Sequence, residues 1–328
     1  MATDTSIEIL DLRHFAAAAL QPVLEAEGIV WKQRLNWDFR ASIRLLAQYL
    51  DNHMLPGYVA LAGERIVGYS FCVYEETKAV IGDVYASPGA LAGGLDAAWA
   101  IEKTLLTHLL ETLQNSPQVD RIESQLLLHP AGSLTGLFHE AEFQIFRRLY
   151  MVQSLVGRSR QVDAQVPLKL ELRPWREEDL NGAARLIAEA YRGHPDSLIN
   201  DQYRAVHGAL RFLNNIVRYA GCGAFAPQAS YVVRQRNGGE MVALIMGSRV
   251  SQECGHITQV CVHPEYRRQG LARTLLQVVA ASFIRLGAVQ VSLTVTESNG
   301  QAIDLYLSEG YSCTHTFDAA VWQRPETA

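Results

Sequence analysis

Residues 258–274 read Thr-Gln-Val-Cys-Val-His-Pro-Glu-Tyr-Arg-Arg-Gln-Gly-Leu-Ala-Arg-Thr, and this stretch decides how the rest of the chain is interpreted. Its first five residues predict a buried strand, which Pro264 ends because proline cannot donate to a β-ladder. From there the apolar residues follow a helical spacing, at Leu271, Leu275, Leu276, Val278 and Val279. The turn between strand and helix contains Gly270 and more arginine than glutamate. Free N–H groups and the helix dipole at such a helix start predict a site for an anion.

Two motifs in this part of the chain resemble those of the GNAT N-acyltransferase superfamily. The first is Val260-Cys261-Val262-His263-Pro264 followed by Arg267-x-x-Gly270-x-Ala272, and the second is Asn299-x-x-Ala302-x-x-Leu305-Tyr306-x-x-x-Gly310-Tyr311. They cover residues 258–311, and the flanking pattern fits from residue 168 to the C-terminus. The resemblance implies an α/β fold with a mixed central sheet flanked by helices. It also implies transfer of an acyl group, usually acetyl, from acetyl-coenzyme A to an amine.

The resemblance further implies which residues hold acetyl-coenzyme A. The amides of residues 268–272, with three arginine side chains, would hold the pyrophosphate. Backbone groups of residues 260–262 would bind the pantetheine arm, and one of their amides would donate to the thioester oxygen as charge develops there. Asn299 either contacts the cofactor or caps its helix. The Cys261 side chain is expected to face away from its neighbours, into the core, and not to carry the acyl group. The expected cofactor-binding residues are Val260, Cys261, Val262, Arg267, Arg268, Gln269, Gly270, Leu271, Ala272, Arg273 and Asn299.

Two residues are the candidates for proton transfer. Tyr306 is the candidate general acid, because its phenol could donate to the departing sulfur, and a packing role is the alternative. His256 is the candidate general base, since strict strand alternation puts it on one face with Val260. The alternatives are a histidine that only forms a hydrogen bond, a glutamate (Glu253 or Glu297) in its place, and an ordered water.

In this fold the acceptor pocket is expected to come from residues 191–219 and 311–323. Acidic and aromatic side chains there suit a cationic amine on a small molecule or a peptide. They are Tyr191, His194, Asp196, Asp201, Tyr203, His207 and Asp318. The identity of the amine, the acyl length and the choice between a monomer and a homodimer stay open at this point.

The composition argues against several other classes of protein. The net charge of −5 leaves no broad cationic face for nucleic acid. Five scattered cysteines without a Cys-x-x-Cys pair favour free thiols in a reducing compartment over disulfides or a zinc site. The N-terminus has no basic segment followed by an apolar one, and no run of about 18 apolar residues occurs. We therefore expect a cytoplasmic protein with no membrane span and no metal.

The chain of 328 residues is long enough for two domains, and its halves repeat one order of elements. The order is strand, two helices, hairpin, strand, helix, strand, helix, strand, and Pro88 matches Pro264. We infer an internal duplication, with two unrelated α/β domains as the alternative. It gives a degenerate GNAT-like domain over residues 1–156, a polar linker over 157–167 and a GNAT acetyltransferase domain over 168–328. The two-copy layout is similar to that of mycothiol synthase, in architecture only.

The first half lacks the polar groups that the motifs of the second half supply. Its loop at residues 89–96 has no cation and ends in Asp96, which would cap the helix and compete with a phosphate. Phe138 stands where the second half has Tyr306. We therefore expect a structural or substrate-shaping first half and N-acetyl transfer in the second. The alternatives are a non-catalytic acyl-coenzyme A-binding regulatory protein and an interaction module in which both copies are scaffolds.

Overall fold

The structure, a computed structural model, describes residues 6–219, 223–236 and 238–325. Cys222, one of the cysteines predicted to be a free thiol, lies outside these residues. The other cysteines, Cys72, Cys254, Cys261 and Cys313, are free thiols.

The chain forms two compact units, and neither is one continuous stretch of sequence. Of the described residues, unit 1 holds 6–35, 39–147 and 317–325, and unit 2 holds 36–38, 148–219, 223–236 and 238–316. The predicted division at the linker therefore differs from the structure, because residues 36–38 and 148–156 belong to unit 2 and the last strand ends in unit 1.

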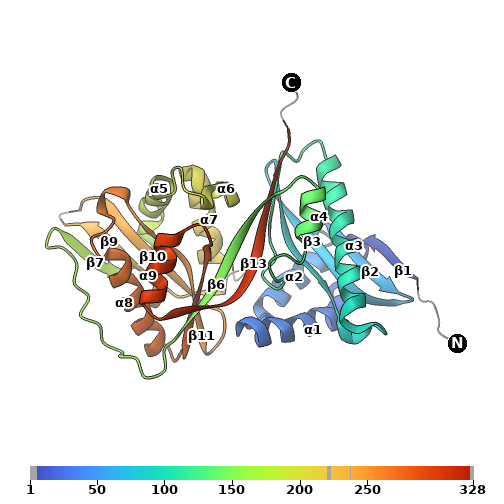
Figure 1. Cartoon of the computed structure of the whole chain (residues 1–328), viewed down its shortest axis with the longest axis horizontal. Helices are drawn as coiled ribbons and strands as arrows, with labels where there is room; N and C mark the ends of the chain where they lie inside the picture. Colours follow the sequence, from blue (N-terminus) through green and yellow to red (C-terminus); the bar gives the residue numbers. More distant parts are fainter. Residues whose placement is uncertain (1–5, 220–222, 237, 326–328) are drawn as a thin grey trace. The chain divides into compact units, whose positions relative to one another are not determined.

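Unit 1 is a mixed sheet with α3 and α4 packed on one face, where they form a single core with the strands (Figure 1). The strands pair in the order β1-β2-β3-β4-β5-β13, and all pairs are antiparallel except β4 with β5. Its elements are β1 (Ile7–Asp11), α1 (Ala17–Leu35), α2 (Arg40–Asp51), β2 (Gly57–Ala62), β3 (Arg65–Glu75), β4 (Lys78–Ala86), α3 (Gly94–Asn115), β5 (Arg121–Gln125), α4 (Thr135–Glu140), the start of β6 (Gln144–Ser154) and the end of β13 (Tyr311–Gln323).

Unit 2 repeats this arrangement, with α8 and α9 in one core cluster and α5 and α7 in another (Figure 1). The strands pair in the order β7-β9-β10-β11-β12-β6, and only β11 with β12 is parallel. Its elements are the rest of β6, β7 (Leu170–Pro174), α5 (Leu180–Ala190), α6 (Asp196–Ile199), α7 (Val206–Arg218), β8 (Ala224–Phe225), β9 (Tyr231–Gln235), β10 (Met241–Arg249), β11 (Cys254–Val262), α8 (Leu271–Arg285), β12 (Gln290–Thr296), α9 (Gly300–Ser308) and the start of β13.

Each sheet is completed by a strand from the other half of the sequence. Residues 319–323 of β13 pair with β5, and residues 148–154 of β6 pair with β12. Residues 311–323 form a single strand, β13, of 13 residues, which begins in unit 2 and ends in unit 1. The exchange gives β5 and β12 a second neighbour, so neither is left as an edge strand with unpaired backbone groups.

Candidate active site

The turn before α8 has the backbone shape expected of an anion site. Arg268 and Gly270 both adopt left-handed backbone angles, with φ of 60° and 81°. Gly270 is the N-cap of the helix, and no side chain caps it. A Cβ added at Gly270 would meet nothing within 4 Å, so the backbone angle, and not a lack of space, favours glycine there. The first N–H groups of α8 are therefore left for an external acceptor.

Of the three predicted arginines, one keeps its guanidinium free with respect to the described residues. Arg267 donates to two backbone carbonyl oxygens, at 3.2 and 2.8 Å. Arg273 forms an ion pair with Glu309 at the end of α9. Arg268 is exposed and has no hydrogen bond or ion pair with any residue that the structure describes. The first two side chains therefore brace the turn, and Arg268 is left to meet an anion.

Strands β11 and β12 separate close to this turn. Their parallel pairing ends at Ile257 and Leu293, although β11 continues to Val262 and β12 to Thr296. Beyond that point β11 stays paired with β10, and β12 stays paired with β6. A gap therefore opens between two strands that are each held by an outer neighbour.

Backbone groups of β11 face this gap. The His263 N–H donates to the carbonyl oxygen of Val242 in β10 at 2.8 Å. Because N–H groups alternate in direction along a strand, those of Val262 and Val260 point away from β10 and into the gap. The Val260 N–H donates to the side-chain Oε1 of Gln259 at 2.9 Å. The amide expected to bind the cofactor thus points as required but already has an acceptor.

Gln259 is a residue of the gap that sequence reasoning missed. Its Oε1 also accepts from the Tyr191 hydroxyl at 2.8 Å, and its buried Nε2 has no partner. A β-bulge sets its direction, because the register of β10 and β11 shifts at Thr258, which has no residue opposite it. A glutamine beside the motif strand carries no signal for such a bulge, so the sequence offered no means of finding it.

The bulge also overturns the predicted placement of His256. Ile257, and not His256, lies with Val260 in the core cluster that packs against α8, so strict alternation fails at this point. His256 Nδ1 is 2.9 Å from the Ser292 hydroxyl, and its ring packs against that of Trp37. Burial lowers the pKa of His256 to about 4. These contacts favour the hydrogen-bonding role over that of a general base. Cys261 lies in the cluster of α5 and α7, away from Val260, as predicted.

A polar cluster lies where the end of β12 meets α6 and α9. The Thr296 hydroxyl donates to Asp196 Oδ1. Asn299 caps α9 by accepting a backbone N–H at 3.3 Å, and its Nδ2 lies 3.3 Å from His194 Nε2. Helix capping, one of the two roles considered for Asn299, is therefore observed. The structure brings together four predicted residues, Tyr191, His194, Asp196 and Asn299, with Thr296 as a member that was not predicted.

Burial shifts the pKa of two side chains in this part of the molecule, His194 and Tyr306. It lowers the pKa of His194, and the carboxylate of Asp196 opposes that shift. It raises the pKa of Tyr306, and Asp196 raises it further. Tyr306 is 7% exposed, and its hydroxyl forms no hydrogen bond with a described residue. The phenol therefore stays protonated at neutral pH and can donate to a bound group.

Several other predicted residues lie outside the cluster. Asp318 is in unit 1, where its carboxylate accepts two hydrogen bonds at 2.7 and 2.8 Å. These contacts lie within unit 1, because the end of β13 pairs with β5, and the assignment of Asp318 to the acceptor pocket stays a prediction. Tyr203 packs against Tyr191, with ring centroids 4.5 Å apart, and Asp201 lies close to it in the sequence. His207, Glu253 and Glu297 are exposed.

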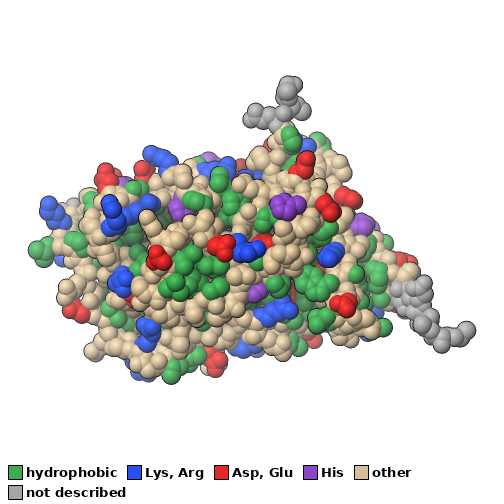
Figure 2. Space-filling view, in the orientation of Figure 1, with side chains coloured by type: hydrophobic (Ala, Val, Ile, Leu, Met, Phe, Trp, Pro, Cys, Tyr) green, Lys and Arg blue, Asp and Glu red, His purple; other side chains and the backbone are tan. Residues whose placement is uncertain are grey.

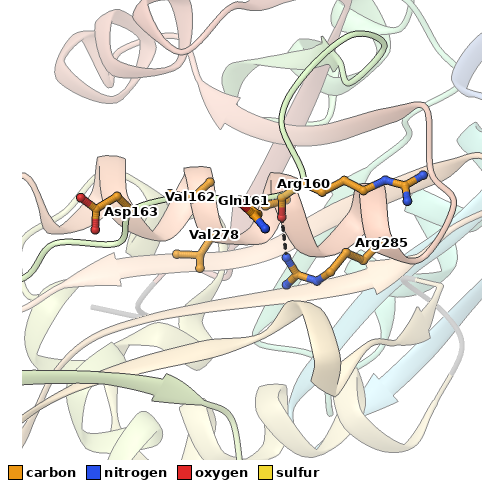
Figure 3. Close-up of a pocket in the computed structure, with 7 residues that line it drawn as sticks. Arg160, Gln161, Val162, Asp163, Val278 and Arg285 are labelled. Atoms are coloured by element: carbon orange, nitrogen blue, oxygen red, sulfur yellow. Dashed lines mark hydrogen bonds between the residues drawn. The ribbon is translucent and has the colours of Figure 1, made fainter.

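The predicted linker shapes a separate pocket of about 470 Å³ against α8. Figure 3 shows the linker running along the helix, where Arg285 donates to the Arg160 carbonyl oxygen at 2.9 Å. Its lining residues are Arg160, Gln161, Val162, Asp163, Val278, Ala281 and Arg285. None of them belongs to the turn, the gap or the polar cluster.

The described residues also allow statements on metal ligands, membrane-spanning helices and surface charge. Among the described residues, no group of three or more His, Cys, Asp or Glu side chains could hold a metal ion. No helix in the part of the chain that the structure describes has both the length and the apolar character to cross a membrane. Basic and acidic side chains are interspersed on the face shown in Figure 2.

Residues 196–311 match the model of the acetyltransferase (GNAT) family. The matched range contains the turn before α8, the gap and most of the polar cluster. The chain therefore carries a GNAT-family domain in its C-terminal half, which is the class that the sequence motifs indicate.

Similarity to solved structures extends over the whole chain. A GCN5-related N-acetyltransferase from Sphaerobacter thermophilus is 16% identical and has a TM-score of 0.64, covering 100% of this chain and 98% of that one. A tandem GNAT protein from the clavulanic acid biosynthesis pathway is 14% identical and has a TM-score of 0.61, covering 98% of this chain and 100% of that one. These likenesses concern the fold, and they confirm the predicted class of two GNAT-like copies in tandem.

Proposed function

We propose that unit 2 transfers an acetyl group from acetyl-coenzyme A to a primary amine by direct attack. The observation that carries the proposal is the open N-terminus of α8 beside the gap between β11 and β12. Backbone amides and the free guanidinium of Arg268 suit a pyrophosphate. The gap lies along the end of β11, directly before that turn, and it offers backbone N–H donors. The pantetheine arm of acetyl-coenzyme A is an extended chain with amides that could accept from them.

Acetyl-coenzyme A, when bound, supplies the thioester that is attacked. The Val260 N–H would exchange its acceptor, Gln259 Oε1, for the carbonyl oxygen on which charge develops. Tyr306 would donate its phenolic proton to the departing sulfur, which its raised pKa and free hydroxyl permit. Asp196, at the end of the gap, would attract the ammonium form of the acceptor, which must lose one proton to water before its nitrogen can attack. The nitrogen gives up a second proton as the C–N bond forms and the C–S bond breaks, and this proton restores the phenol of Tyr306. The chain's own residues thus cover cofactor binding, charge stabilisation and leaving-group protonation.

The test is calorimetric titration of acetyl-coenzyme A into the wild type and into the double variant Arg268→Glu/Gly270→Glu. We expect one site per chain in the wild type and a loss of affinity of more than about 100-fold in the variant, since carboxylates replace the cation and fill the turn. The matched control is Leu95→Glu, which adds a carboxylate at the start of α3, where Leu95 is exposed. It should bind like the wild type.

Two sites per chain would show that unit 1 also binds acetyl-coenzyme A. No binding to the wild type would contradict the proposal. Binding without turnover on any amine would favour the alternative of a non-catalytic acyl-coenzyme A-binding regulatory protein.

A further inference from the structure

Arg148 on β6 is a buried cation that has no anionic partner among the described residues. Its side chain is 9% exposed, and its Nη2 donates to the Thr294 hydroxyl at 3.2 Å. Its Nε is buried and has no hydrogen-bond partner. No described residue forms an ion pair with it. Buried charges in proteins are normally paired, because desolvation of an unpaired charge costs several kcal/mol. The arrangement therefore points to an anion that is supplied from outside the chain.

The place of Arg148 in the sheet connects it to the proposed acceptor site. Arg148 is opposite Thr296 in the antiparallel pairing of β6 and β12, and opposite residues project to the same face of a sheet. Thr296 donates to Asp196. A buried cation and a carboxylate thus lie on either side of Thr296, at the end of the gap. The positive charge of Arg148 also acts on the pKa of Tyr306 and of His194, lowering both, so it lies near the cluster.

The charges around this point define what the site would accept. Burial lowers the pKa of His194, and the charges of Arg267 and Arg148 lower it further. The guanidinium of Arg267 already donates to two backbone carbonyl oxygens, so Arg148 is the cation with unused donors, and Asp196 is the carboxylate. One cation and one carboxylate suit a zwitterionic acceptor, whose ammonium would lie near Asp196 and whose carboxylate would lie on the guanidinium of Arg148. A phosphate ester, with close to two negative charges, would need more cations than this.

We propose that Arg148 binds the carboxylate of the acceptor, so that the acceptor is an amine that also carries a carboxylate, as an amino acid does. The proposal rests on the proposed function in taking an amine as the acceptor. It makes Arg148 the residue that determines specificity. The guanidinium has unused N–H donors in a planar fork, which matches the geometry of a carboxylate. Asp196 fixes the position of the amine that is to be acetylated.

The experiment measures binding, so it does not depend on turnover. The twenty common L-amino acids are screened by thermal shift on the wild type, with and without saturating coenzyme A. The tightest binder and its carboxamide, which keeps the shape but loses the negative charge, are then titrated by calorimetry. We expect the carboxamide to bind about 100-fold more weakly, because it leaves the buried guanidinium unpaired. This comparison needs no variant.

Three variants then locate the effect. Arg148→Gln should bind the amino acid and its carboxamide alike, and Arg148→Lys should keep part of the preference, since it keeps the charge and loses the fork. The matched control is Arg147→Gln, at a neighbouring arginine with 48% of its side chain exposed that lies 3.7 Å from Asp318. It should behave like the wild type. Acetyl-coenzyme A binding to each variant reports that unit 2 is folded.

The outcomes separate this proposal from the proposed function. It is overturned if no amino acid binds the wild type, if the carboxamide binds as well as the acid, or if Arg148→Gln keeps the preference. Acetylation of amines without regard to a carboxylate would overturn it and leave the acetyltransferase intact. Arg148-dependent binding of an amino acid by a chain that does not bind acetyl-coenzyme A would support the carboxylate site and refute the transferase.

Discussion

In both units a parallel pair of strands separates before one of the strands ends, but the free backbone N–H groups beyond that point have different acceptors. In unit 1 the pairing of β4 with β5 ends at Ile81, although β4 continues to Ala86. The N–H of Val84 donates to the Asp83 carboxylate at 2.8 Å, and that of Ala86 donates to Glu102 Oε1 at 3.0 Å. In unit 2 the amide that matches Val84 is bound by the neutral side chain of Gln259 instead.

The carboxylates of unit 1 belong to a buried network. Glu102 lies 3.3 Å from His129 Nε2. Glu27 accepts from Trp31 Nε1 at 2.8 Å and from the Tyr69 hydroxyl at 2.6 Å, and it is hydrogen bonded to Asp83. Side chains of unit 1 already accept these two N–H groups, so fewer donors are left there for a bound cofactor. The comparison teaches that the same strand geometry can be kept while different side chains occupy its free amides.

The N-termini of α8 and α3 also differ in charge. Before α8, Arg268 and Gly270 are left-handed, and the guanidinium of Arg268 is free with respect to the described residues. The first turn of α3 carries Asp96 in place of a cation. Negative charge at a helix N-terminus stabilises the helix itself and removes its attraction for an external anion.

The largest expected effect is on kcat, and it compares Tyr306 with Phe138, its counterpart in unit 1. Tyr306→Phe should lower kcat by about 100-fold or more, through loss of a general acid, without changing acetyl-coenzyme A affinity. Steady-state kinetics with an accepted amine and calorimetry on the same preparation measure the two quantities. Phe138→Tyr in α4 is the matched control and should leave both unchanged. Equal kcat values for wild type and Tyr306→Phe would reduce Tyr306 to a packing residue.

Local features of unit 2 could be predicted from the sequence, because they depend on neighbouring residues. The strand, the turn at Gly270 and the start of α8 follow from proline, glycine and apolar spacing within residues 258–274. The repeat of element order is likewise a property of local patterns. That repeat, together with the family motifs, was enough to place two copies of one fold in the chain.

The exchange of strands could not be predicted, because pairing is a long-range choice. Nothing in β6 shows that its second part pairs with a strand about 140 residues later, so Arg148 could not be connected to the acceptor site. The bulge at Thr258 depends on the register with β10, and strict alternation therefore misplaced His256 and overlooked Gln259. The parts of the candidate site that depend on neighbouring residues in the sequence were predicted. The parts that depend on pairing between distant strands were missed.

The buried acids of unit 1 predict a pH effect of opposite sign to that of the buried His256 in unit 2, whose lowered pKa favours the folded chain as the pH rises. Burial raises the pKa of Asp83 well above its usual value. The folded chain then keeps a proton that the unfolded chain loses as the pH rises above about 4. Stability is therefore fully present at low pH and is lost as the pH rises towards the folded pKa, by up to about 1.4 kcal/mol per pH unit. Asp83→Asn should make this slope less steep, because it removes one of two buried acids with a raised pKa, while the amide keeps the acceptor for Val84 and can donate to Glu27.

Urea unfolding of wild type and Asp83→Asn between pH 5 and pH 8 measures this slope. Asp96→Asn removes an exposed carboxylate of the same unit and should leave the slope as in the wild type. An unchanged slope in Asp83→Asn would mean that Asp83 does not hold the proton in the folded chain.

The smallest expected effect concerns the acceptor on Val260. Gln259→Leu removes Oε1, so the N–H of Val260 and the hydroxyl of Tyr191 lose their acceptor, and the free energy of unfolding should fall by about 1 kcal/mol. The same change frees the amide for a thioester, so acetyl-coenzyme A should bind about threefold to fivefold more tightly, as about 1 kcal/mol allows. Glu102→Leu is the control in unit 1, where the N–H of Ala86 loses its acceptor and acetyl-coenzyme A affinity should not change. Weaker binding by Gln259→Leu would show that Gln259 orders the gap for the cofactor and does not compete with it.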